Sequence, residues 1–351
     1  MAHGTQSGIA RAVLALDIGG ANLKAAHSDG TAGSEPFAVW KQPKELGRAI
    51  ATLVRRMPSG DAIAVTMTAE LCDCFETKAD GVRAVLDAIE SALRGLRRKI
   101  SIRVWLTNGL LVSPTEARAE PLKAAAANWL ALATWAGRFC TEGPALVLDV
   151  GSTTTDIIPL RDGVPVPRGR ADLDRLASGE LVYSGAKRTP VFALVRSVAV
   201  GDRTCRVAAE LFATTRDVYL WLGDLHEQPD DCDTADGRPA TREHAAARLA
   251  RVVCADRSIL DDAAITQVAR QAADAQRIDL VRALTQVETS LGQRARAIIT
   301  AGSGEFLARR TVERLHKPPR LVSIGDQHGP EISSAACAFA LAVIAAERGI
   351  K

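Results

Sequence analysis

The sequence lacks the features that mark membrane-spanning, secreted and nucleic-acid-binding proteins. No apolar run approaches the ~20 residues that a membrane-spanning helix needs. The net charge is only +3 over 351 residues, which gives no electrostatic argument for a nucleic acid or an anionic membrane as partner. Residues 1–10 lack the basic and apolar regions of a signal peptide, and the seven cysteines are odd in number and scattered. We therefore expect a cytoplasmic protein with reduced thiols.

Several common catalytic motifs are also missing. No Gly-x-x-x-x-Gly-Lys phosphate loop occurs, and no histidine has a recognisable nucleophile turn beside it. Cys72 and Cys74 have no companion pair, so we do not expect a structural zinc site. The acidic stretch at residues 229–237 lacks the glutamate that closes a calcium-binding loop. Two interpretations of this stretch stay open: a solvated loop before a helix that begins near Thr241, or a second metal or substrate site.

The composition that remains is that of a globular protein with two domains. Hydrophobic residues make up 47% and charged residues 24% of the chain, which are ordinary values for such proteins. A length of 351 residues exceeds one typical hydrophobic core and fits two. Aromatic residues are few, at 4%, and alanine is plentiful, so we expect helices that pack closely.

The stretch at residues 145–159 is the most informative part of the chain. Its apolar start predicts a buried strand that ends at Asp149, followed by a turn containing Gly151 and several hydroxyl residues, then Asp156 and a second strand. Successive backbone N–H groups in such a turn form a concave nest that wraps an anion. The aspartate at its base is suited to a divalent metal. The alternative is an ordinary hairpin with a loop rich in serine and threonine.

The same pattern occurs near the start of the chain, at residues 13–26. An apolar strand ends at Asp17, a glycine-containing turn follows, and the strand resumes. Each copy is then followed by an Asp-Gly pair, which is a strong hairpin signal. The unit of three strands and two turns therefore occurs twice, at residues 11–41 and 145–168. Such an internal duplication predicts two similar domains that face a shared cleft.

Asp17 and Asp149 hold equivalent positions in the two copies. If the copies face each other, the two carboxylates flank one cleft, which suits a Mg²⁺ ion that bridges phosphate oxygens. The alternative is that each aspartate only accepts backbone hydrogen bonds in its own turn. A third element, at residues 301–304 between a predicted strand and a helix, adds glycines and a helix N-terminus that favour an anion. We predict Mg²⁺ as cofactor, bound by Asp17 and Asp149.

We predict that the three elements bind a phosphate or diphosphate. The residues expected to do so are Gly19, Gly20, Ala21, Asn22, Lys24, Gly151, Ser152, Thr153, Thr154, Gly302, Ser303 and Gly304.

Apolar periodicity predicts the remaining elements. Helices are expected at residues 46–56, 81–98, 120–139, 204–222, 241–254, 259–272, 277–291 and 333–348. Further strands are expected at residues 61–66, 102–106, 297–300 and 321–324, and residues 170–190 are expected to be irregular.

These elements together resemble the superfamily of sugar kinases, heat-shock ATPases and actin. More narrowly, the chain resembles the hydantoinase/oxoprolinase-like branch found in tetrahydromethanopterin-linked one-carbon metabolism. The stretches that carry the resemblance are residues 17–22, 67–75, 127–129, 149–159, 179–185, 188–190 and 232–239. The resemblance implies an α/β fold with two duplicated ribonuclease-H-like domains around a central cleft. We expect residues 1–125 in the first domain, residues 126–332 in the second with helical insertions, and the C-terminal helix at residues 333–351 packing back on the first.

The resemblance also implies a reaction. Archaeal members of this branch act in methanofuran biosynthesis, where they join an aminomethylfuran-methyl diphosphate to the phenol oxygen of γ-glutamyltyramine and release pyrophosphate. A Mg-dependent transferase with small-molecule substrates is therefore expected, with γ-glutamyltyramine, tyramine or tyrosine as the phenol. The alternatives are an ATP-dependent small-molecule kinase or hydantoinase/oxoprolinase-type ATPase, and a non-enzymatic nucleotide-binding regulator. We expect no nucleic-acid or membrane partner, and leave a homo-oligomer open.

The candidate site residues fall into two further groups. Asp17, Asp73, Asp149 and Asp156 are the candidate catalytic residues, with Asp73 and Asp156 as candidate bases for the phenol, whose pKa is about 10 in water. Within the stretches that carry the resemblance, the residues expected to bind substrate are Glu70, Tyr183, Arg188, Asp233 and Asp236.

Overall fold

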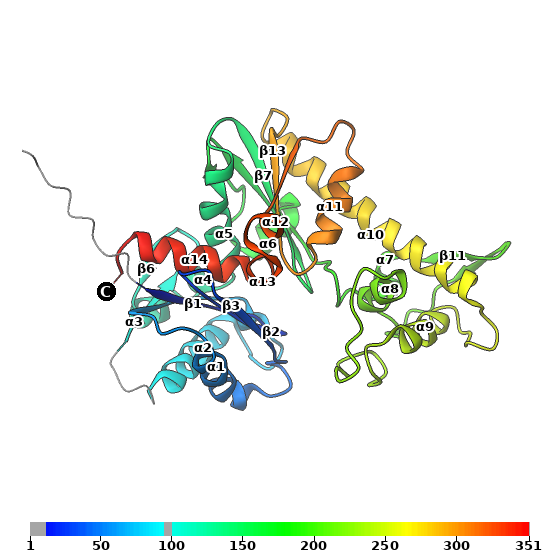
Figure 1. The fold of residues 1–351 in the computed structure, drawn as a ribbon, viewed down its shortest axis with the longest axis horizontal. Helices are drawn as coiled ribbons and strands as arrows, with labels where there is room; N and C mark the ends of the chain where they lie inside the picture. Colours follow the sequence, from blue (N-terminus) through cyan, green and yellow to red (C-terminus); the bar gives the residue numbers. More distant parts are fainter. Residues whose placement is uncertain (1–11, 95–99, 351) are drawn as a thin grey trace, which may run out of the picture. The chain divides into compact units, whose positions relative to one another are not determined.

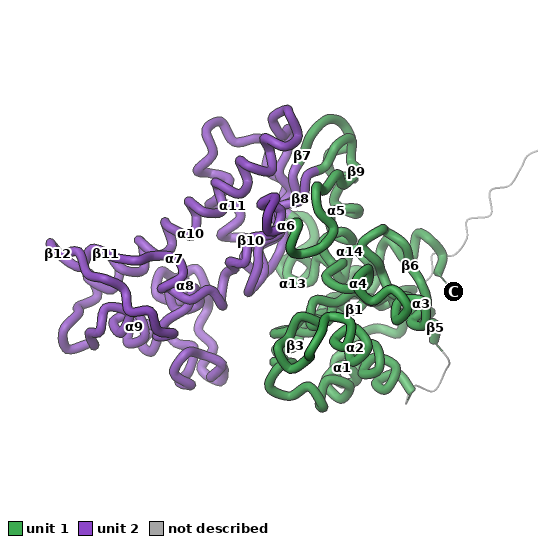
Figure 2. Tube along the Cα trace, turned by 180° about the vertical axis from the view of Figure 1, so that it is seen from behind, with its two compact units in different colours: residues 1–145, 160–174, 324–351 green, residues 146–159, 175–323 purple. Residues whose placement is uncertain are grey.

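The computed structural model describes residues 12–94 and 100–350. Two compact units make up the chain, coloured separately in Figure 2. Unit 1 comprises residues 1–145, 160–174 and 324–351, and unit 2 comprises residues 146–159 and 175–323. Residues 1–10, which lack the features of a signal peptide, and the end of the helix predicted at residues 81–98 lie outside the described residues. The two domains predicted from the sequence, with a boundary after residue 125, stay a prediction.

Unit 1 is built on a six-stranded sheet with the order β3-β2-β1-β4-β5-β6. β1 and β2 pair antiparallel, whereas β4 runs parallel to β1 and β5 runs parallel to β4. Strands were predicted at all of these places except β6. Their bounds are β1 (Val13–Ile18), β2 (Asn22–His27), β3 (Ala32–Pro36), β4 (Ala62–Met67), β5 (Ser101–Trp105) and β6 (Leu111–Val112).

Helices cover both faces of this sheet (Figure 1). α1 (Leu46–Arg55) and α2 (Lys78–Leu93) pack together, and their apolar side chains share one core with Leu14, Leu16 and Ile18 of β1. α14 (Ala336–Glu347) packs on β1, β2 and β4, and α5 (Asn128–Ala136) packs on α14. Side chains alternate between the faces of a strand, so Asp17 points away from the α1/α2 core.

The remaining elements of unit 1 are short. They are η1 (Pro43–Glu45), η2 (Ala69–Leu71), α3 (Pro114–Ala119), α4 (Pro121–Ala124), η3 (Gly137–Phe139), β9 (Val164–Pro165), α12 (Ile324–His328) and α13 (Pro330–Ser334).

The sheet of unit 2 repeats the arrangement of the first. Its order is β10-β8-β7-β13-β14, with the short β9 also paired to β8. In both sheets, the first strand lies between its own hairpin partner and a strand from later in the chain, and this shared order confirms the predicted α/β fold of duplicated, ribonuclease-H-like sheets. The bounds are β7 (Pro144–Val150), β8 (Thr155–Arg161), β10 (Leu181–Val182), β13 (Ala297–Ala301) and β14 (Arg320–Ser323).

One long helix organises the rest of unit 2. α10 (Asp262–Ser290) is 29 residues long and contacts four other helices and the β11–β12 ribbon (Figure 1). The other elements are α6 (Asp172–Ser178), which spans the unit boundary, α7 (Val191–Leu194), β11 (Ser197–Val200), β12 (Arg203–Arg206), α8 (Thr215–Leu222), α9 (Arg242–Arg251) and α11 (Glu305–Glu313). Their buried side chains form a core of their own, distinct from the core of unit 1.

Several predicted helices are wrong in their extent. The helix expected at residues 120–139 is broken after α4, because Ala126 has a left-handed backbone with φ +46°. The helix expected at residues 204–222 begins only at Thr215, and residues 203–206 pair as a strand instead. Apolar spacing alone does not separate these states, because neighbouring strands and tertiary contacts override local periodicity.

Other differences concern continuity. The two helices expected at residues 259–272 and 277–291 are the single helix α10, whose buried side chains Ala272, Ala273 and Gln276 keep the junction packed within unit 2. Residues 170–190, expected to be irregular, contain α6 and β10. α14 is preceded by the separate short helix α13, so the predicted helix at residues 333–348 is divided.

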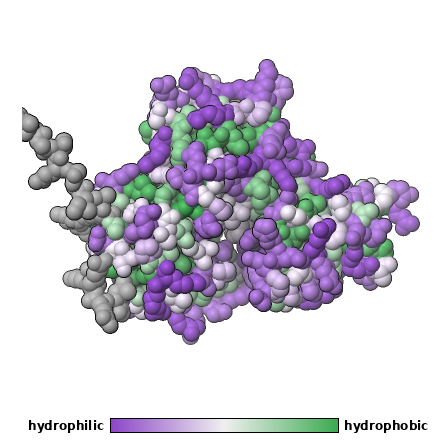
Figure 3. Space-filling view, in the orientation of Figure 1, coloured by the Kyte–Doolittle hydropathy of each residue, from purple (hydrophilic) through white to green (hydrophobic). Residues whose placement is uncertain are grey.

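Large apolar regions of the protein would be seen on its surface or in its helices. On the face seen in Figure 3, hydrophilic side chains cover most of the surface, and apolar atoms show between them. In the part of the chain that the structure describes, none of the helices combines the length and the apolar character needed to cross a membrane.

Candidate functional site

The turn between β1 and β2, here called the Asp17 turn (residues 17–22), is closed by its own backbone. The Gly19 N–H donates to the carbonyl of Asn22 at 3.0 Å. A Cβ atom at Gly19 would lie 2.7 Å from that same carbonyl oxygen, so the tight turn requires glycine there. The predicted phosphate-binding residues of this turn are therefore held in one compact backbone loop.

The segment after β4, here called the Glu70 loop (residues 68–76), packs directly against the Asp17 turn. The Thr68 N–H donates to the carbonyl of Ile18 at 2.9 Å. A Cβ atom at Gly20 would lie 2.9 Å from the Cys72 sulfur, so a thiol side chain touches the turn. Both candidate elements of unit 1 thus meet at the ends of neighbouring strands, where sites collect in open α/β sheets.

Asp17 lies among polar side chains on one face of the sheet. It is 4% exposed, and in register it stands opposite Lys24 on β2 and Thr66 on β4. The Thr66 hydroxyl is buried, and its oxygen has no hydrogen-bond partner among residues 12–94 and 100–350. Carboxylate and hydroxyl oxygens are hard ligands of the kind Mg²⁺ prefers, so these residues fit the predicted metal.

A larger cluster of metal ligands is absent from the described residues. No group of three or more histidine, cysteine, aspartate or glutamate side chains there is placed to hold a metal ion. Mg²⁺ commonly takes only one or two protein carboxylates and completes its shell with water and substrate phosphates. The donors near Asp17 therefore suit a metal that arrives with a phosphorylated ligand.

The Asp149 turn (residues 149–155) of unit 2 is closed in the same way, by a hydrogen bond of 2.9 Å from the Gly151 N–H to the Thr154 carbonyl. The predicted third element lies directly on it. A Cβ atom at Gly302 would lie 2.2 Å from the carbonyl oxygen of Val150 and 2.4 Å from Oδ1 of Asp149. The structure therefore brings Gly302 against the carboxylate of Asp149 itself.

A further backbone segment, residues 184–188, also packs against the Asp149 turn. The N–H groups of Lys187 and Arg188 both donate to the Ser152 carbonyl at 3.0 Å. A Cβ atom at Gly185 would lie 2.6 Å from the Thr153 nitrogen. Gly185 is not among the predicted site residues, although it lies in one of the stretches that carry the family resemblance.

Asp156, a predicted base for the phenol, is engaged in a buried ion pair. One of its oxygens lies 2.9 Å from a guanidinium nitrogen of Arg175, whose side chain is 1% exposed. Arg175 also donates to the carbonyl of Glu180 at 3.0 Å, which ties the start of β8 to the β10 segment. These contacts favour bracing of the turn over proton transfer, and the role of Asp156 as a base stays a prediction.

Glu70 lies in η2, directly after β4, and its environment is unusual. The residue is 1% exposed, and neither carboxyl oxygen has a hydrogen-bond partner among residues 12–94 and 100–350. Burial raises the pKa of Glu70 to about 8, with a smaller contribution in the same direction from Asp172. α2 packs tightly above it, since a Cβ atom at Gly81 would lie 2.4 Å from the Glu70 carbonyl oxygen.

The other predicted substrate-binding residues lie in unit 2, and two of them are brought together. Arg188 and Asp233 form an ion pair at 3.6 Å. Tyr183 is 61% exposed. In unit 1, Asp73 is exposed in the Glu70 loop. The roles predicted for these residues stay predictions.

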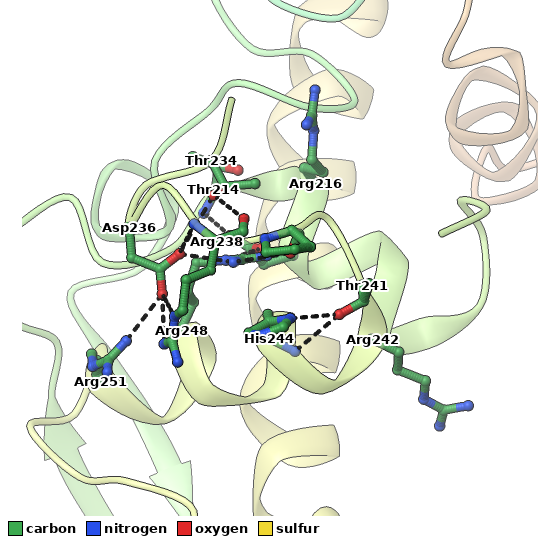
Figure 4. Close-up of polar contacts among 12 residues, drawn as sticks. Thr214, Arg216, Thr234, Asp236, Arg238, Thr241, Arg242, His244, Arg248 and Arg251 are labelled. Carbon is green, nitrogen blue, oxygen red and sulfur yellow. Dashed lines mark hydrogen bonds and ion pairs between the residues drawn. The ribbon is translucent and has the colours of Figure 1, made fainter. Parts of the chain in front are cut away.

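Asp236 is surrounded by arginines (Figure 4). Its oxygens lie 2.6 Å from Arg238, 2.9 Å from Arg248 and 3.3 Å from Arg251. Burial alone would raise the pKa of Asp236, but the hydrogen bonds from Arg238 and Arg248 hold it well below its usual range. A carboxylate with this many donors is suited to fixing the loop, and its predicted contact with substrate stays a prediction.

Arg248 links this acidic loop to the helices beneath it. It is fully buried and lies 2.7 Å from Asp217 of α8. Burial raises the pKa of Asp217, an effect that the charge of Arg248 opposes. Thr241 caps α9 by accepting from the His244 N–H at 3.4 Å, as Figure 4 shows. Of the two interpretations left open for residues 229–237, these contacts favour the loop that precedes a capped helix. No sequence motif points to Asp217 or Arg248.

The chain is similar to proteins of known activity. The profile of the Hydantoinase/oxoprolinase family matches residues 61–348. The (4-{4-[2-(gamma-L-glutamylamino)ethyl]phenoxymethyl}furan-2-yl)methanamine synthase of Methanocaldococcus jannaschii is 33% identical over 334 residues, which cover 94% of this chain and 96% of the relative. The synthase of the same name from Methanococcus vannielii is 31% identical over 202 residues, which cover 57% of this chain and 89% of the relative.

A solved structure of an archaeal actin homolog in complex with ADP aligns with a TM-score of 0.46 at 15% identity, over 96% of this chain and 99% of that chain. The family assignment rests on the profile match and on the nearly full-length relative. The chain belongs to the Hydantoinase/oxoprolinase family.

Proposed function

We propose that this protein is a transferase of methanofuran biosynthesis. The reaction condenses an aminomethylfuran-methyl diphosphate with the phenol of γ-glutamyltyramine, or of tyramine or tyrosine, to form an aryl ether. The bond between the furan-methyl carbon and the diphosphate oxygen breaks, the phenol oxygen bonds to that carbon, and pyrophosphate leaves with the electron pair. The phenol proton passes to a base.

The observation that carries this proposal is the similarity to the Methanocaldococcus jannaschii synthase, which extends over 94% of this chain. The name of that relative describes a phenoxymethyl-furan amine, which is the aryl ether that such a condensation forms. Two turns with equivalent aspartates, one in each sheet, supply the chemistry that a diphosphate leaving group needs.

The chain's own residues would bind the diphosphate through backbone N–H groups. In unit 2, Ser152 and Thr153 are fixed by residues 184–188, so their amides keep one orientation without reorganisation. In unit 1, Lys24 stands opposite Asp17 and adds a positive charge beside the turn. When bound, Mg²⁺ would neutralise charge on the leaving diphosphate, with Asp17 and Asp149 as the proposed ligands.

The phenol requires a group that accepts its proton. Asp73 is exposed in the Glu70 loop and is the candidate better placed to meet a substrate, whereas Asp156 is already paired with Arg175. Developing positive charge on the furan-methyl carbon would reduce the demand on the phenol as nucleophile, so a modest base suffices. Tyr183, Arg188, Asp233 and Asp236 remain proposed contacts for the rest of the phenol substrate.

A second candidate is an ATP-dependent small-molecule kinase or hydantoinase/oxoprolinase-type ATPase. The match to the Hydantoinase/oxoprolinase family favours it, because the same two turns would hold the phosphates of a nucleotide. Thermal-shift titration separates the two candidates. Stabilisation by Mg-ATP without stabilisation by pyrophosphate would support the ATPase.

The decisive test is a pyrophosphate-release assay with the aminomethylfuran-methyl diphosphate and Mg²⁺. The phenols tyramine, tyrosine and γ-glutamyltyramine are compared as acceptors, and the ether product is identified by mass spectrometry. Release that depends on both substrates supports the transferase. Absence of release with every phenol, together with ATP hydrolysis, would replace it with the second candidate.

A further inference from the structure

Around Glu70 in unit 1, the carboxylates outnumber the neighbouring ammonium groups by one when Glu70 is ionised. Lys78 at the start of α2 forms an ion pair of 2.5 Å with Asp172 at the start of α6. When Glu70 is ionised, these three groups comprise two carboxylates and one ammonium. Asp172 acts to raise the pKa of Glu70 and Lys78 acts to lower it, so both groups lie close enough to influence the buried carboxyl.

Three further charged side chains on α2 and the Glu70 loop are exposed, namely Arg83, Asp73 and Glu76. On α2, the neighbouring Arg83 is exposed and bonded to Asp80 at 3.1 Å. On the Glu70 loop, Asp73 and Glu76 are exposed and negative. The backbone N–H of Ala126 also acts to lower the pKa of Glu70, but it carries no full charge.

Both oxygens of Glu70 also lack the partners that buried carboxyl groups normally have. Neither oxygen has a well-formed hydrogen bond within the described residues, where the Ala126 N–H exerts only the smallest of the effects on the carboxyl, although the side chain is nine-tenths buried or more. Unpartnered buried polar groups are rare and costly, so each one calls for a ligand, a water or a function. When ionised, Glu70 would offer two acceptor oxygens and one negative charge. A primary ammonium group, with its three N–H donors and one positive charge, matches both.

The location adds a constraint on the ligand. Glu70 follows β4 by three residues, and β4 is the parallel neighbour of β1, whose end carries the Asp17 turn. Neighbouring strands lie about 4.8 Å apart, so the carboxyl and the phosphate-binding turn are within the reach of one small molecule. The ligand expected here carries an ammonium group at one end and a diphosphate at the other.

We propose that Glu70 binds the aminomethyl ammonium of the furan substrate and thereby selects the amine-bearing diphosphate. This inference rests on the proposed function and deepens it, because it assigns the group that recognises the substrate's amine. The neutral carboxyl gives up its proton to solvent when the ammonium binds, and a charge-assisted ion pair replaces it. Since Glu70 is buried, the short η2 turn with its exposed residue Leu71 must shift to admit the amine.

Proton release is the measurement that tests this assignment without turnover. Binding of the aminomethylfuran-methyl diphosphate is measured by calorimetry near pH 7, with Mg²⁺ and no phenol, in buffers of different ionisation enthalpy. A group with a pKa of about 8 is about 90% protonated there, so we expect nearly one proton released per ligand. The same diphosphate with a methyl group in place of the aminomethyl group should release none.

The variant Glu70→Gln replaces the neutral carboxyl by an amide of nearly the same shape. We expect its proton release on binding the amine-bearing substrate to vanish and its KM for that substrate to rise by about 10-fold or more. Its KM for the methyl analogue should stay within about twofold. Glu76→Gln, in the same loop but exposed, is the matched control and should behave as the native protein.

Two outcomes would overturn the inference. One is equal proton release by native protein with the aminomethyl and methyl ligands, which requires no variant and so does not depend on the folding of Glu70→Gln. The other is a Glu70→Gln protein that folds and still discriminates between the two ligands as the native protein does. If pyrophosphate release occurs in either case, the proposed function stands and only the role of Glu70 fails.

Discussion

The Asp17 turn and the Asp149 turn share one sequence pattern but differ in what lies against them. The Asp17 turn accepts backbone hydrogen bonds from Phe37, Val39 and Thr68, and its closest contact at Gly20 is a side chain, that of Cys72. At the Asp149 turn the closest contacts involve backbone, with Gly302 against the Val150 carbonyl and Gly185 against the Thr153 nitrogen. A close contact with backbone is hard to relieve, whereas the Cys72 side chain can change rotamer. We infer that, at these closest contacts, the second turn is the rigid element and the first is the adaptable one.

The polar surroundings differ in the same sense. Beside the Asp149 turn, Asp156 is matched by Arg175 in a closed ion pair. Beside the Asp17 turn, Glu70 is buried without a matching charge. The Asp149 turn, where the neighbouring charges are paired, suits fixed binding of a phosphate. The surroundings of the Asp17 turn, where Glu70 lacks a matching charge, suit recognition of a charged group on the substrate.

A large loss of stability is expected for Gly302→Ala. The added Cβ would meet the Val150 carbonyl at 2.2 Å, and φ at this position is +101°. Left-handed strain of about 1–2 kcal/mol and overpacking of about 1–3 kcal/mol together predict a loss of roughly 2–5 kcal/mol in unfolding free energy. Urea denaturation measures it. Gly292→Ala, which has φ +70° but open space around it, isolates the strain and should lose only about 1–2 kcal/mol.

Arg175→Met tests the ion pair of the rigid turn. It removes the guanidinium that neutralises the buried Asp156, for which the expected loss of unfolding free energy is about 3–5 kcal/mol. The double variant Arg175→Met with Asp156→Leu removes both charges and should recover most of that loss. A single variant as stable as the native protein would show that the pair does not brace the turn.

Asp17→Asn and Asp149→Asn compare the two turns as metal ligands. Each is expected to lower the rate of pyrophosphate release by about 10²–10³-fold, because stabilisation of the leaving group's charge is lost. The Mg²⁺ concentration for half-maximal rate should rise in both. An effect confined to one variant would show that the two turns do not share the metal role. Thermal unfolding curves exclude a loss of folding as the cause.

The burial of Glu70 near the Asp17 turn should make the stability of the protein depend on pH. The folded-state pKa of Glu70, about 8, lies above its ordinary value of 4.5. The stability that this group contributes is therefore fully present below about pH 4.5 and is lost as pH rises to about 8. The free energy of unfolding, measured by urea denaturation across this range, should fall with pH in the native protein. Its slope should be up to about 1.4 kcal/mol per pH unit steeper than in Glu70→Gln. Parallel curves would contradict the buried state of Glu70.

The smallest effect is expected for Gly20→Ala. Its Cβ would lie 2.9 Å from the Cys72 sulfur, which is a side-chain atom that can move. A loss below about 1.5 kcal/mol is predicted, as for a tolerated change in packing volume. Combining it with Cys72→Ala should relieve that loss, because the sulfur is gone. A loss as large as that of Gly302→Ala would remove the distinction between the two turns.

The duplicated strands, both turns and the glycine element before α11 could be predicted from the sequence. The apolar pattern of a strand and the requirement for glycine in a tight turn each involve only a few neighbouring residues, so a single sequence is enough to predict them. The extent of α10 and the break at Ala126 could not be predicted in this way. Whether a helix continues, and whether an alanine adopts a left-handed backbone, depends on what each segment packs against. Local apolar periodicity does not reflect those contacts.

The same division applies to the site. The sequence by itself determined that two aspartates stand at the ends of two equivalent strands, because that placement follows from local order alone. Only the tertiary structure decided that Gly302 touches Asp149, that Arg175 neutralises Asp156 and that Glu70 is buried without a partner. Each of these facts joins residues far apart in the chain. The charge state of a carboxyl depends on its burial and its neighbours, which exist only once the chain has folded.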